Sequence, residues 1–271
     1  MSAPAPTSQA SGGRPPAHAG ATRSRLSIIG VLGELLMLAG ILLGLFVLWQ
    51  LFYTDIQGER AQREVVESLD WVDPAVDDVV QGISAGESTG PETIPDDLKY
   101  TDIDPPAMDY PGFTETFATM MVPRWGEDYV KPVSEGVTRA DVLDPLGIGH
   151  YPDTALPGEI GNFAVSGHRT TYGKPFNAVA DLQVGDSLIV QTEDAWFVYH
   201  VESWEIVKPT QVEVIAPTPN QPGVAPTERS ITLTTCHPMF SAAERWIVHG
   251  TFDYWAPTGH GVPEELLEVP A

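Results

Sequence analysis

Cys236 is the only cysteine among 271 residues, and it lies in the stretch TLTTCHP, residues 232–238. A single thiol in an exported domain cannot form an internal disulfide. It is a buried small side chain, a site of intermolecular pairing or a reactive nucleophile. A thiol attacks a carbonyl as the thiolate, so a reactive cysteine needs a base or a cation beside it. The neighbouring residues must therefore decide what Cys236 does.

The stretch SITLTTC, residues 230–236, alternates like a β-strand. Alternation places Ile231 and Leu233 on one face, whereas Cys236 shares the other face with two threonine hydroxyls. Cys236 therefore does not point with the apolar residues. Arg245 begins the next β-type run, and antiparallel pairing would return it to a position beside Cys236. A guanidinium there lowers the pKa of the thiol or holds a developing oxyanion.

The base is to be sought among seven histidines. His168 ends the strand-like run GNFAVSGH and precedes polar residues, which places it at a strand end within reach of a neighbouring strand. His249 alternates onto the face of Arg245 and stays a minor candidate. The other five are disfavoured because they lie in the tails, inside a strand, in a loop or next to the thiol but pointing away: His18, His150, His200, His237 and His260.

An apolar segment near the N-terminus indicates a membrane anchor. Residues 35–52 carry no charge, and eighteen helical residues span roughly 27 Å, close to the hydrocarbon thickness of a bilayer. The segment ends in interface-favouring aromatic residues, whereas a cleaved signal peptide has a shorter apolar run followed by small residues. Three arginines precede it and acids follow it. The positive-inside rule thus predicts a single-pass protein of the cell membrane, with a cytoplasmic N-terminus and an extracellular remainder.

The chain is strongly acidic, with a net charge of −23. Such a surface repels phosphate backbones, so we expect no nucleic-acid partner. Between Asp70 and Thr116 the sequence has twelve acids, six prolines and a single basic residue, Lys99. This composition offers little to a hydrophobic core, and it predicts an extended, mostly solvated stalk. Packing of some of it on the domain surface stays open.

From Phe117 onward the sequence consists of short β-type runs separated by turn residues. Six runs carry β-branched and aromatic residues in partial alternation: FATMMVP, GNFAVSGH, DSLIVQTED, AWFVYHVESWEIV, SITLTTC and RWIVHGTFDYW. Six to eight short strands with little helix predict an all-β closed barrel or sandwich rather than a βαβ fold.

We therefore predict five segments. A cytoplasmic tail covers 1–25, the transmembrane anchor 26–53 and the acidic, proline-rich extracellular stalk 54–116. The β-rich catalytic domain covers 117–257, and residues 258–271 form a C-terminal tail.

At this point the residues resemble a known family. TLTTC, with a histidine 68 positions upstream and an arginine nine positions downstream, is similar to the TLxTC motif of the sortases with its histidine and arginine partners. Sortases are membrane-anchored cysteine transpeptidases of Gram-positive bacteria. GNFAVSGHRTTYGKPF and TLTTCHP look most like class E, the housekeeping type of high-GC species. The resemblance covers about 117–257.

The resemblance implies a closed eight-stranded β-barrel and a transpeptidation reaction. Cys236 would cleave a Leu-(Ala/Pro)-x-Thr-Gly sorting signal of a secreted protein between Thr and Gly, forming a thioacyl-enzyme. His168 would protonate the leaving amine, and Arg245 would hold the oxyanion with support from the backbone amide of Thr235. A peptidoglycan-precursor amine would accept the acyl group. The resemblance implies no cofactor, and none of the acids matches the calcium site of some sortases, so we predict no metal.

Other interpretations stay open on the sequence alone. A pilin-polymerising sortase would use a lysine of a partner protein as the acceptor. An L,D-transpeptidase is less suitable because its cysteine normally follows a His-Gly pair, and a papain-like peptidase would place its cysteine before the histidine. A non-catalytic, stalked surface protein would need neither His168 nor Arg245.

Overall fold

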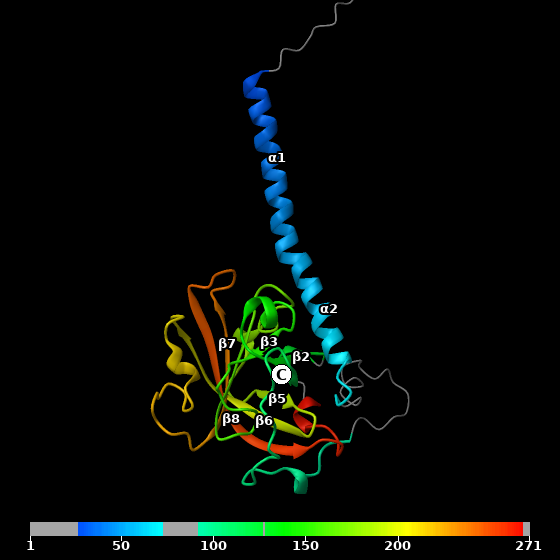
Figure 1. Ribbon diagram of the computed structural model, residues 1–271, viewed down its shortest axis with the longest axis vertical. Coiled ribbons are helices and arrows are strands. Elements are labelled where there is room, and N and C mark those ends of the chain that lie inside the picture. Colours follow the sequence, from blue (N-terminus) through cyan, green and yellow to red (C-terminus); the bar gives the residue numbers. More distant parts are fainter. Residues whose placement is uncertain (1–26, 73–91, 127, 268–271) are drawn as a thin grey trace, which may run out of the picture. The chain divides into compact units, whose positions relative to one another are not determined.

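The computed structural model describes residues 27–72, 92–126 and 128–267 (Figure 1). The chain divides into two compact units, Met1–Leu45 and Phe46–Ala271. The predicted cytoplasmic tail with its arginines, and the central part of the predicted stalk, lie outside the described residues.

Helix α1, Ile28–Leu48, contains the predicted anchor. Its mean hydropathy is 2.5 and its side chains are exposed, so by length and composition it is able to cross a membrane. A short π-helix, Trp49–Tyr53, leads from α1 into helix α2, Thr54–Glu67.

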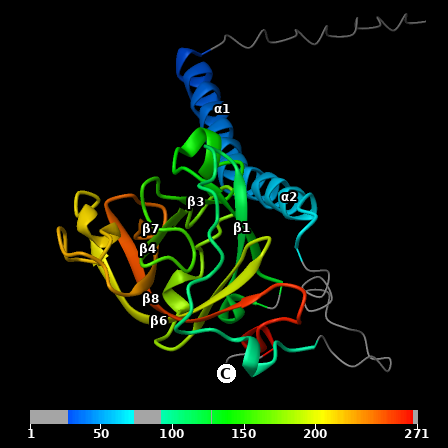
Figure 2. The same ribbon diagram turned by 60° about the horizontal axis from the view of Figure 1, so that its bottom comes forward.

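Eight strands form a closed barrel in the order β1-β2-β3-β4-β7-β8-β6-β5, with β5 pairing back onto β1 (Figures 1 and 2). The pairs β2–β3 and β4–β7 are parallel, and the others are antiparallel. The strand bounds are β1 Thr116–Met121, β2 Val130–Glu135, β3 Ile148–His150, β4 Gly161–Gly167, β5 Ser187–Gln191, β6 Ala195–Val207, β7 Arg229–His237 and β8 Glu244–Pro257. The predicted closed barrel is confirmed.

All six predicted β-runs are strands, but β2 and β3 have no sequence pattern that marks them. β2 contains Pro132, which has no amide hydrogen to donate and is unusual inside a strand. The proline is accommodated because β2 pairs with β3 only from Val133 onward, so the β3 side of Pro132 is free of the ladder. β3 has three residues, too few for a periodic signal.

Alternating side chains of the strands fill the barrel. Phe163, Ile231, Leu233 and Val248 are at most 1% exposed and belong to one continuous apolar cluster. Ile231 and Leu233 are the residues that the alternation of the cysteine-containing run predicted to point inward. Because these side chains occupy the inner face of β7, Cys236 must lie on the outer face.

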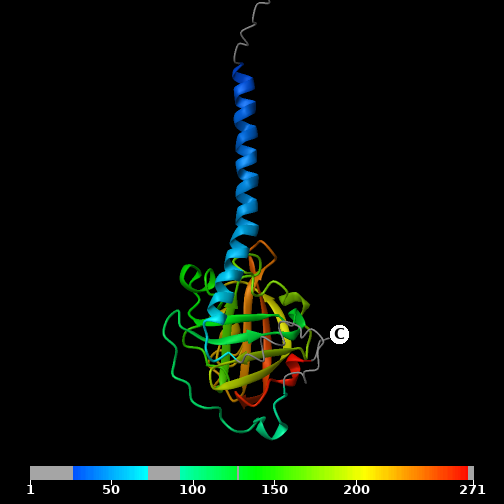
Figure 3. The same ribbon diagram turned by 90° about the vertical axis from the view of Figure 1, so that its right-hand side faces the viewer.

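A second apolar cluster lies outside the barrel and includes residues from the C-terminal part of the predicted stalk. Ile94, 3% exposed, packs with Val262 against Ile189, Trp196 and the neighbouring strands. Residues 92–116 form two isolated β-bridges with the rest of the chain, Thr93 with Val262 and Tyr100 with Trp255. Residues 92–116 and the C-terminal segment thus run along the barrel (Figure 3), because their few apolar side chains cover apolar residues on its outer face.

Helix α2 also packs on the barrel unit instead of standing free. Its buried residues Thr54, Gly58 and Gln62 recur every four positions and form one stripe. A Cβ at Gly58 would come 2.4 Å from the backbone carbon of Tyr172, so glycine permits this close approach. Gln62 Nε2 donates to the carbonyl of Tyr172 at 2.8 Å, and Lys174 pairs with Asp55. Helix α2 is therefore joined to the loop that follows β4.

Candidate active site

Three neighbouring strands bring the predicted catalytic positions into one row. In the parallel pair β4–β7 each residue faces the one 68 positions later, up to Ser166 opposite Thr234. Two positions further this register places His168 beside Cys236. In the antiparallel pair β7–β8, Cys236 lies directly opposite Arg245. These residues are far apart in the sequence but lie side by side on neighbouring strands or directly after them. We call His168, Cys236 and Arg245 the Cys236 row.

The row lies on the outer face of the sheet. Cys236 is partly exposed, whereas Ile231 and Leu233, of opposite parity, are buried in the barrel. Directly paired residues share a face, so Arg245 emerges on the same side as Cys236. A barrel end with these three side chains on one face offers a thiol, an imidazole and a guanidinium to a bound carbonyl group.

His168 is held by an acid that sequence reasoning did not identify. Its Nε2 lies 2.6 Å from Oδ1 of Asp144, which directly follows the short π-helix Arg139–Leu143. The ring of Tyr172 lies 5.3 Å from the imidazole. Burial lowers the pKa of His168 below its usual 6.5, while the hydrogen bond and the charge of Asp144 oppose this change. Asp144 therefore both orients the ring and favours its protonated form.

Arg245 is tied to the loop that precedes it. Its Nη1 donates to the carbonyls of Ala242 at 3.0 Å and of Glu244 at 2.9 Å. These two hydrogen bonds hold the guanidinium next to the β7–β8 turn. A fixed cation that keeps further N–H donors is suited to stabilise an oxyanion, because the donors are oriented before charge develops.

Arg169 contacts the backbone of Cys236. Its side chain is buried. Nη1 lies 3.4 Å from the carbonyl oxygen of Cys236 and 2.8 Å from Nδ1 of His237, and the guanidinium lies 5.2 Å from the Trp246 ring. His237 and Trp246 alternate onto the face opposite to Cys236. Arg169 thus supports the backbone of the nucleophile from behind.

Thr235 fixes the spacing between β4 and β7. Its buried hydroxyl donates to the carbonyl of Gly167 at 2.7 Å. Gly167 precedes His168 and Thr235 precedes Cys236, so this bond joins the residues immediately before the two reactive side chains. The side chain of Thr235 therefore has a structural function of its own.

The other described histidines lie away from Cys236 or have other partners. His249 pairs with Thr232, four residues before Cys236, which is about 13 Å along a strand. It contacts Thr232 Oγ1 at 2.9 Å and Glu205 Oε1 at 3.2 Å, so it belongs to a separate polar chain. His237 stays on the face predicted for it, away from the reaction.

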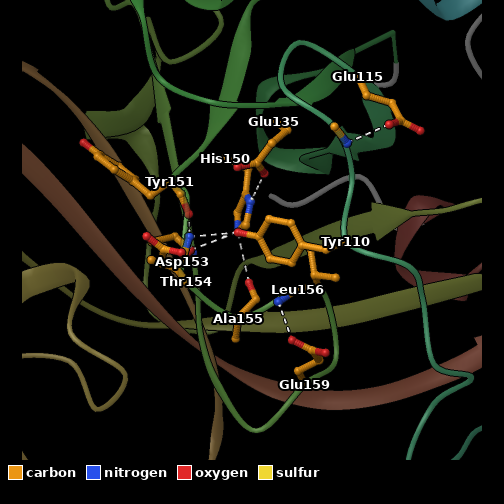
Figure 4. A network of polar contacts seen from close by, with 12 residues as sticks. Tyr110, Glu115, Glu135, His150, Tyr151, Asp153, Thr154, Ala155, Leu156 and Glu159 are labelled. Carbon is orange, nitrogen blue, oxygen red and sulfur yellow. Dashed lines mark hydrogen bonds and ion pairs between the residues drawn. The ribbon is translucent and has the colours of Figure 1, made fainter.

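His150 is the centre of a buried polar network (Figure 4). Its Nδ1 lies 2.6 Å from Oε2 of Glu135, and its Nε2 contacts the carbonyl of Ala155 at 3.1 Å and the hydroxyl of Thr154 at 2.9 Å. Tyr110, from the segment that runs along the barrel, accepts a hydrogen bond from the amide of Asp153 in the same region. His150 is fully buried, so this network is structural and holds the β3–β4 loop.

The connection from β6 to β7 forms an apolar wall on the face of the Cys236 row. Val214 and Ile215, in the 3₁₀-helix Val212–Ile215, pack with Val207 and Ile247. Ile247 is two residues beyond Arg245 and points to the same side. Asn162 Nδ2 donates to the carbonyls of Val214 and Ala216 and holds the wall in place. The sequence alone did not reveal this lining.

Within the described residues, His200, Asp253 and Glu265 offer ligand-type atoms within 4.8 Å of one another. Asp253 is eight residues beyond Arg245 on β8, about 26 Å along the strand. An ion at this group would not reach Cys236. The expectation of a reaction without a metal stays a prediction.

Comparisons with known proteins find relatives of this chain in sequence and in fold. Residues 120–253 match a family model described as Sortase domain. Sortase SrtE1 of Streptomyces coelicolor is 32% identical over 242 residues, which cover 87% of this chain and 60% of that protein. Among solved structures, a SrtA sortase from Actinomyces oris is 47% identical with a TM-score of 0.59, covering 64% of this chain and 98% of that one. Sortase E1 from Streptomyces coelicolor with a tripeptide in the active site is 38% identical with a TM-score of 0.53, covering 56% and 97%.

Proposed function

The chain belongs to the sortase family, with class E members among its relatives, and from this premise we propose that it is a membrane-anchored cysteine transpeptidase. The observation that carries the proposal is the Cys236 row: Cys236 and Arg245 pair across β7 and β8, and His168 directly follows the end of β4, whose register with β7 leads to Cys236. The chain spans 60% of the length of SrtE1, and the activity is proposed for this chain on its own residues.

In the first half-reaction, the thiolate of Cys236 attacks the carbonyl carbon of the threonine in a Leu-(Ala/Pro)-x-Thr-Gly sorting signal. A carbon–sulfur bond forms and the bond to the glycine nitrogen breaks. His168 delivers its proton to the leaving amine, and Arg245 with the backbone amide of Thr235 stabilises the oxyanion. Asp144 supports this step because its charge favours the imidazolium form of His168.

In the second half-reaction, an amine of a peptidoglycan precursor attacks the thioester. The carbon–nitrogen bond forms, the carbon–sulfur bond breaks, and the proton of the incoming amine returns to His168. The thiolate is thereby regenerated. Ile215, the partly exposed residue of the apolar wall, is suited to contact the leucine of the signal, because the wall lies on the same face as Cys236.

Helix α1 is proposed to anchor the enzyme in the cell membrane, with the barrel outside and the N-terminus in the cytoplasm. Its length and hydropathy support the span, and the arginines before it support the orientation.

The test is a transpeptidation assay with the full chain in detergent or nanodiscs. Peptides with Leu-Ala-x-Thr-Gly and Leu-Pro-x-Thr-Gly are supplied with a glycine-type amine, and a lysine-containing peptide tests the pilin-polymerising alternative. We expect cleavage between Thr and Gly and transfer of the acyl group to the amine. Absence of cleavage of both peptides, or equal cleavage by Cys236→Ala, would exclude the proposed activity.

A further inference from the structure

Four exposed apolar side chains flank the start of β8. Trp204 and Ile206 lie at the end of β6, and Ile206 pairs with Trp246. Met239 and Phe240 follow the end of β7, where His237 pairs with Glu244. We call Trp204, Ile206, Met239 and Phe240 the apolar rim. Phe240 is 71% exposed and Trp204 is 52% exposed, so these side chains have much apolar surface in contact with water.

The rim is the opposite of what the composition of the chain leads one to expect. The chain carries a net charge of −23, but the loop 238–243 reads PMFSAA and contains no charged residue. Phe240 adopts a φ of 63°, a conformation that is uncommon for a bulky side chain. Because Met239 and Phe240 are exposed at this loop, they add little buried apolar area to the barrel core. Exposed apolar side chains gathered around one strand end are typical of an interaction site.

The rim lies at the end of the barrel unit at which α2 begins. Figures 1 and 3 both show the β7–β8 connection level with the start of α2. The contacts agree, since α2 packs on Tyr172 and Lys174, Tyr172 contacts His168, and the next residue, Arg169, contacts His237 at the base of the loop. The rim, the Cys236 row and the first turn of α2 are therefore at one end.

The first turn of α2 at that end directly follows the last residues of the proposed anchor in the chain. Trp49, Phe52 and Tyr53 immediately precede α2, and exposed aromatic residues in this position favour the membrane interface. Because Asp55, Gly58 and Gln62 are already docked on the barrel unit, little chain separates the bilayer from the rim. Because so little chain lies between the anchor and the rim, we take the lipid surface as the partner of the rim.

We propose that the apolar rim rests in the interfacial region of the membrane that carries the anchor and holds the Cys236 row at the bilayer surface. The inference rests on the proposed anchoring. Its functional consequence is that substrates tethered to the same membrane meet Cys236 at a raised effective concentration.

The test measures lipid contact and does not depend on catalysis. Cys236→Ala removes the only cysteine, and Phe240→Cys then provides one labelling site for an environment-sensitive NBD probe. The matched control is Ile103→Cys. Ile103 is also well exposed, at 57%, but it lies next to Trp255, which is eleven residues beyond Glu244 on β8, about 36 Å along the strand. Both full-length proteins are placed in phosphatidylcholine nanodiscs, with and without phosphatidylglycerol.

We expect blue-shifted emission at position 240 and several-fold stronger quenching there than at position 103 by lipids with a doxyl group on the acyl chain. Equal, water-like emission at both positions would overturn the proposal, and so would a full chain that does not enter the nanodiscs. A blue shift without quenching by labelled lipid would identify a protein contact and would also contradict it.

A second measurement uses unlabelled protein. The double variant Met239→Ser/Phe240→Ser is compared with the parent on a peptide in solution and on the same peptide tethered to nanodisc lipid. We expect the ratio of the tethered rate to the soluble rate to fall several-fold. An unchanged ratio would contradict the membrane role. If the parent shows no transpeptidation at all, the proposed function fails, whereas the quenching result still decides whether the rim touches lipid.

Discussion

Replacing Asp144 with asparagine should expose its effect on His168. The carboxylate Oδ1 lies 2.6 Å from Nε2 of the imidazole, and the two side chains are 24% and 13% exposed. Asparagine keeps the size of the side chain and removes its charge. The charge is what favours the imidazolium, so the substitution should lower the pKa of His168 further than burial already does.

The magnitude follows from the partial burial of the pair. Exposed ion pairs contribute at most about 1 kcal/mol, and hydrogen bonds to charged groups about 1.5–3 kcal/mol. For a pair of this intermediate exposure we expect about 1 kcal/mol, or about a fivefold smaller imidazolium population above the pKa of His168. Well below that pKa the imidazole is protonated in both proteins, so the difference should disappear. The rate optimum should therefore move to lower pH.

The assay is kcat/KM for peptide cleavage as a function of pH. Asp141→Asn is the matched control, because Asp141 lies within the π-helix that Asp144 follows but bonds to Thr138 rather than to His168. We expect the control to keep the parent profile. If Asp144→Asn and the parent have the same profile and the same rate at neutral pH, the acid does not support the protonated imidazole.

Four further changes test the supports around the row. Thr235→Val removes the buried bond to Gly167 and should lower the free energy of unfolding by about 1 kcal/mol in urea titrations, together with the rate of thioacylation, whereas Thr235→Ser should keep both. Arg169→Lys keeps the charge but loses the planar stacking on Trp246, so steady-state kinetics should show a lower kcat with little change in KM; an unchanged kcat would show that Arg169 does not contribute to the reaction. Gly58→Ala forces a Cβ against the backbone of Tyr172 and should destabilise the docking of α2 by about 2 kcal/mol, seen as faster hydrogen exchange in α2, while Gln57→Ala on the same helix should not. Burial lowers the pKa of both His168 and His249, so the unfolding midpoint should fall as the pH drops below 6.5, and a midpoint independent of pH in this range would contradict the burial of neutral imidazoles.

The strands that carry chemistry could be predicted because each has a local signal. Ile231, Leu233 and Cys236 alternate, and a strand that is buried on one side must keep that alternation. The partners His168 and Arg245 stand at strand ends, where a register argument or a short loop can bring them together. The family resemblance added the identity of the reaction, which alternation by itself does not contain.

The supporting residues could not be predicted in this way. Asp144 and Arg169 reach the row through loops, and loop conformations have no periodicity that a sequence reveals. The composition of 92–116 favoured a solvated stalk, but single side chains such as Ile94 are sufficient to attach it to an apolar outer face. The need for glycine at position 58 arises only from contact with the backbone of Tyr172, which is more than a hundred residues away in the sequence.

The most direct measurement is the mass of the intermediate formed with a Leu-Ala-x-Thr-Gly peptide, followed by peptide mapping of the acylated residue. We predict a thioester on Cys236, formed at least about a hundredfold more slowly by His168→Ala and by Arg245→Ala, with the double variant little slower than either. An acyl group on another residue, or normal thioester formation in either single variant, would contradict a reaction carried out by these three side chains together.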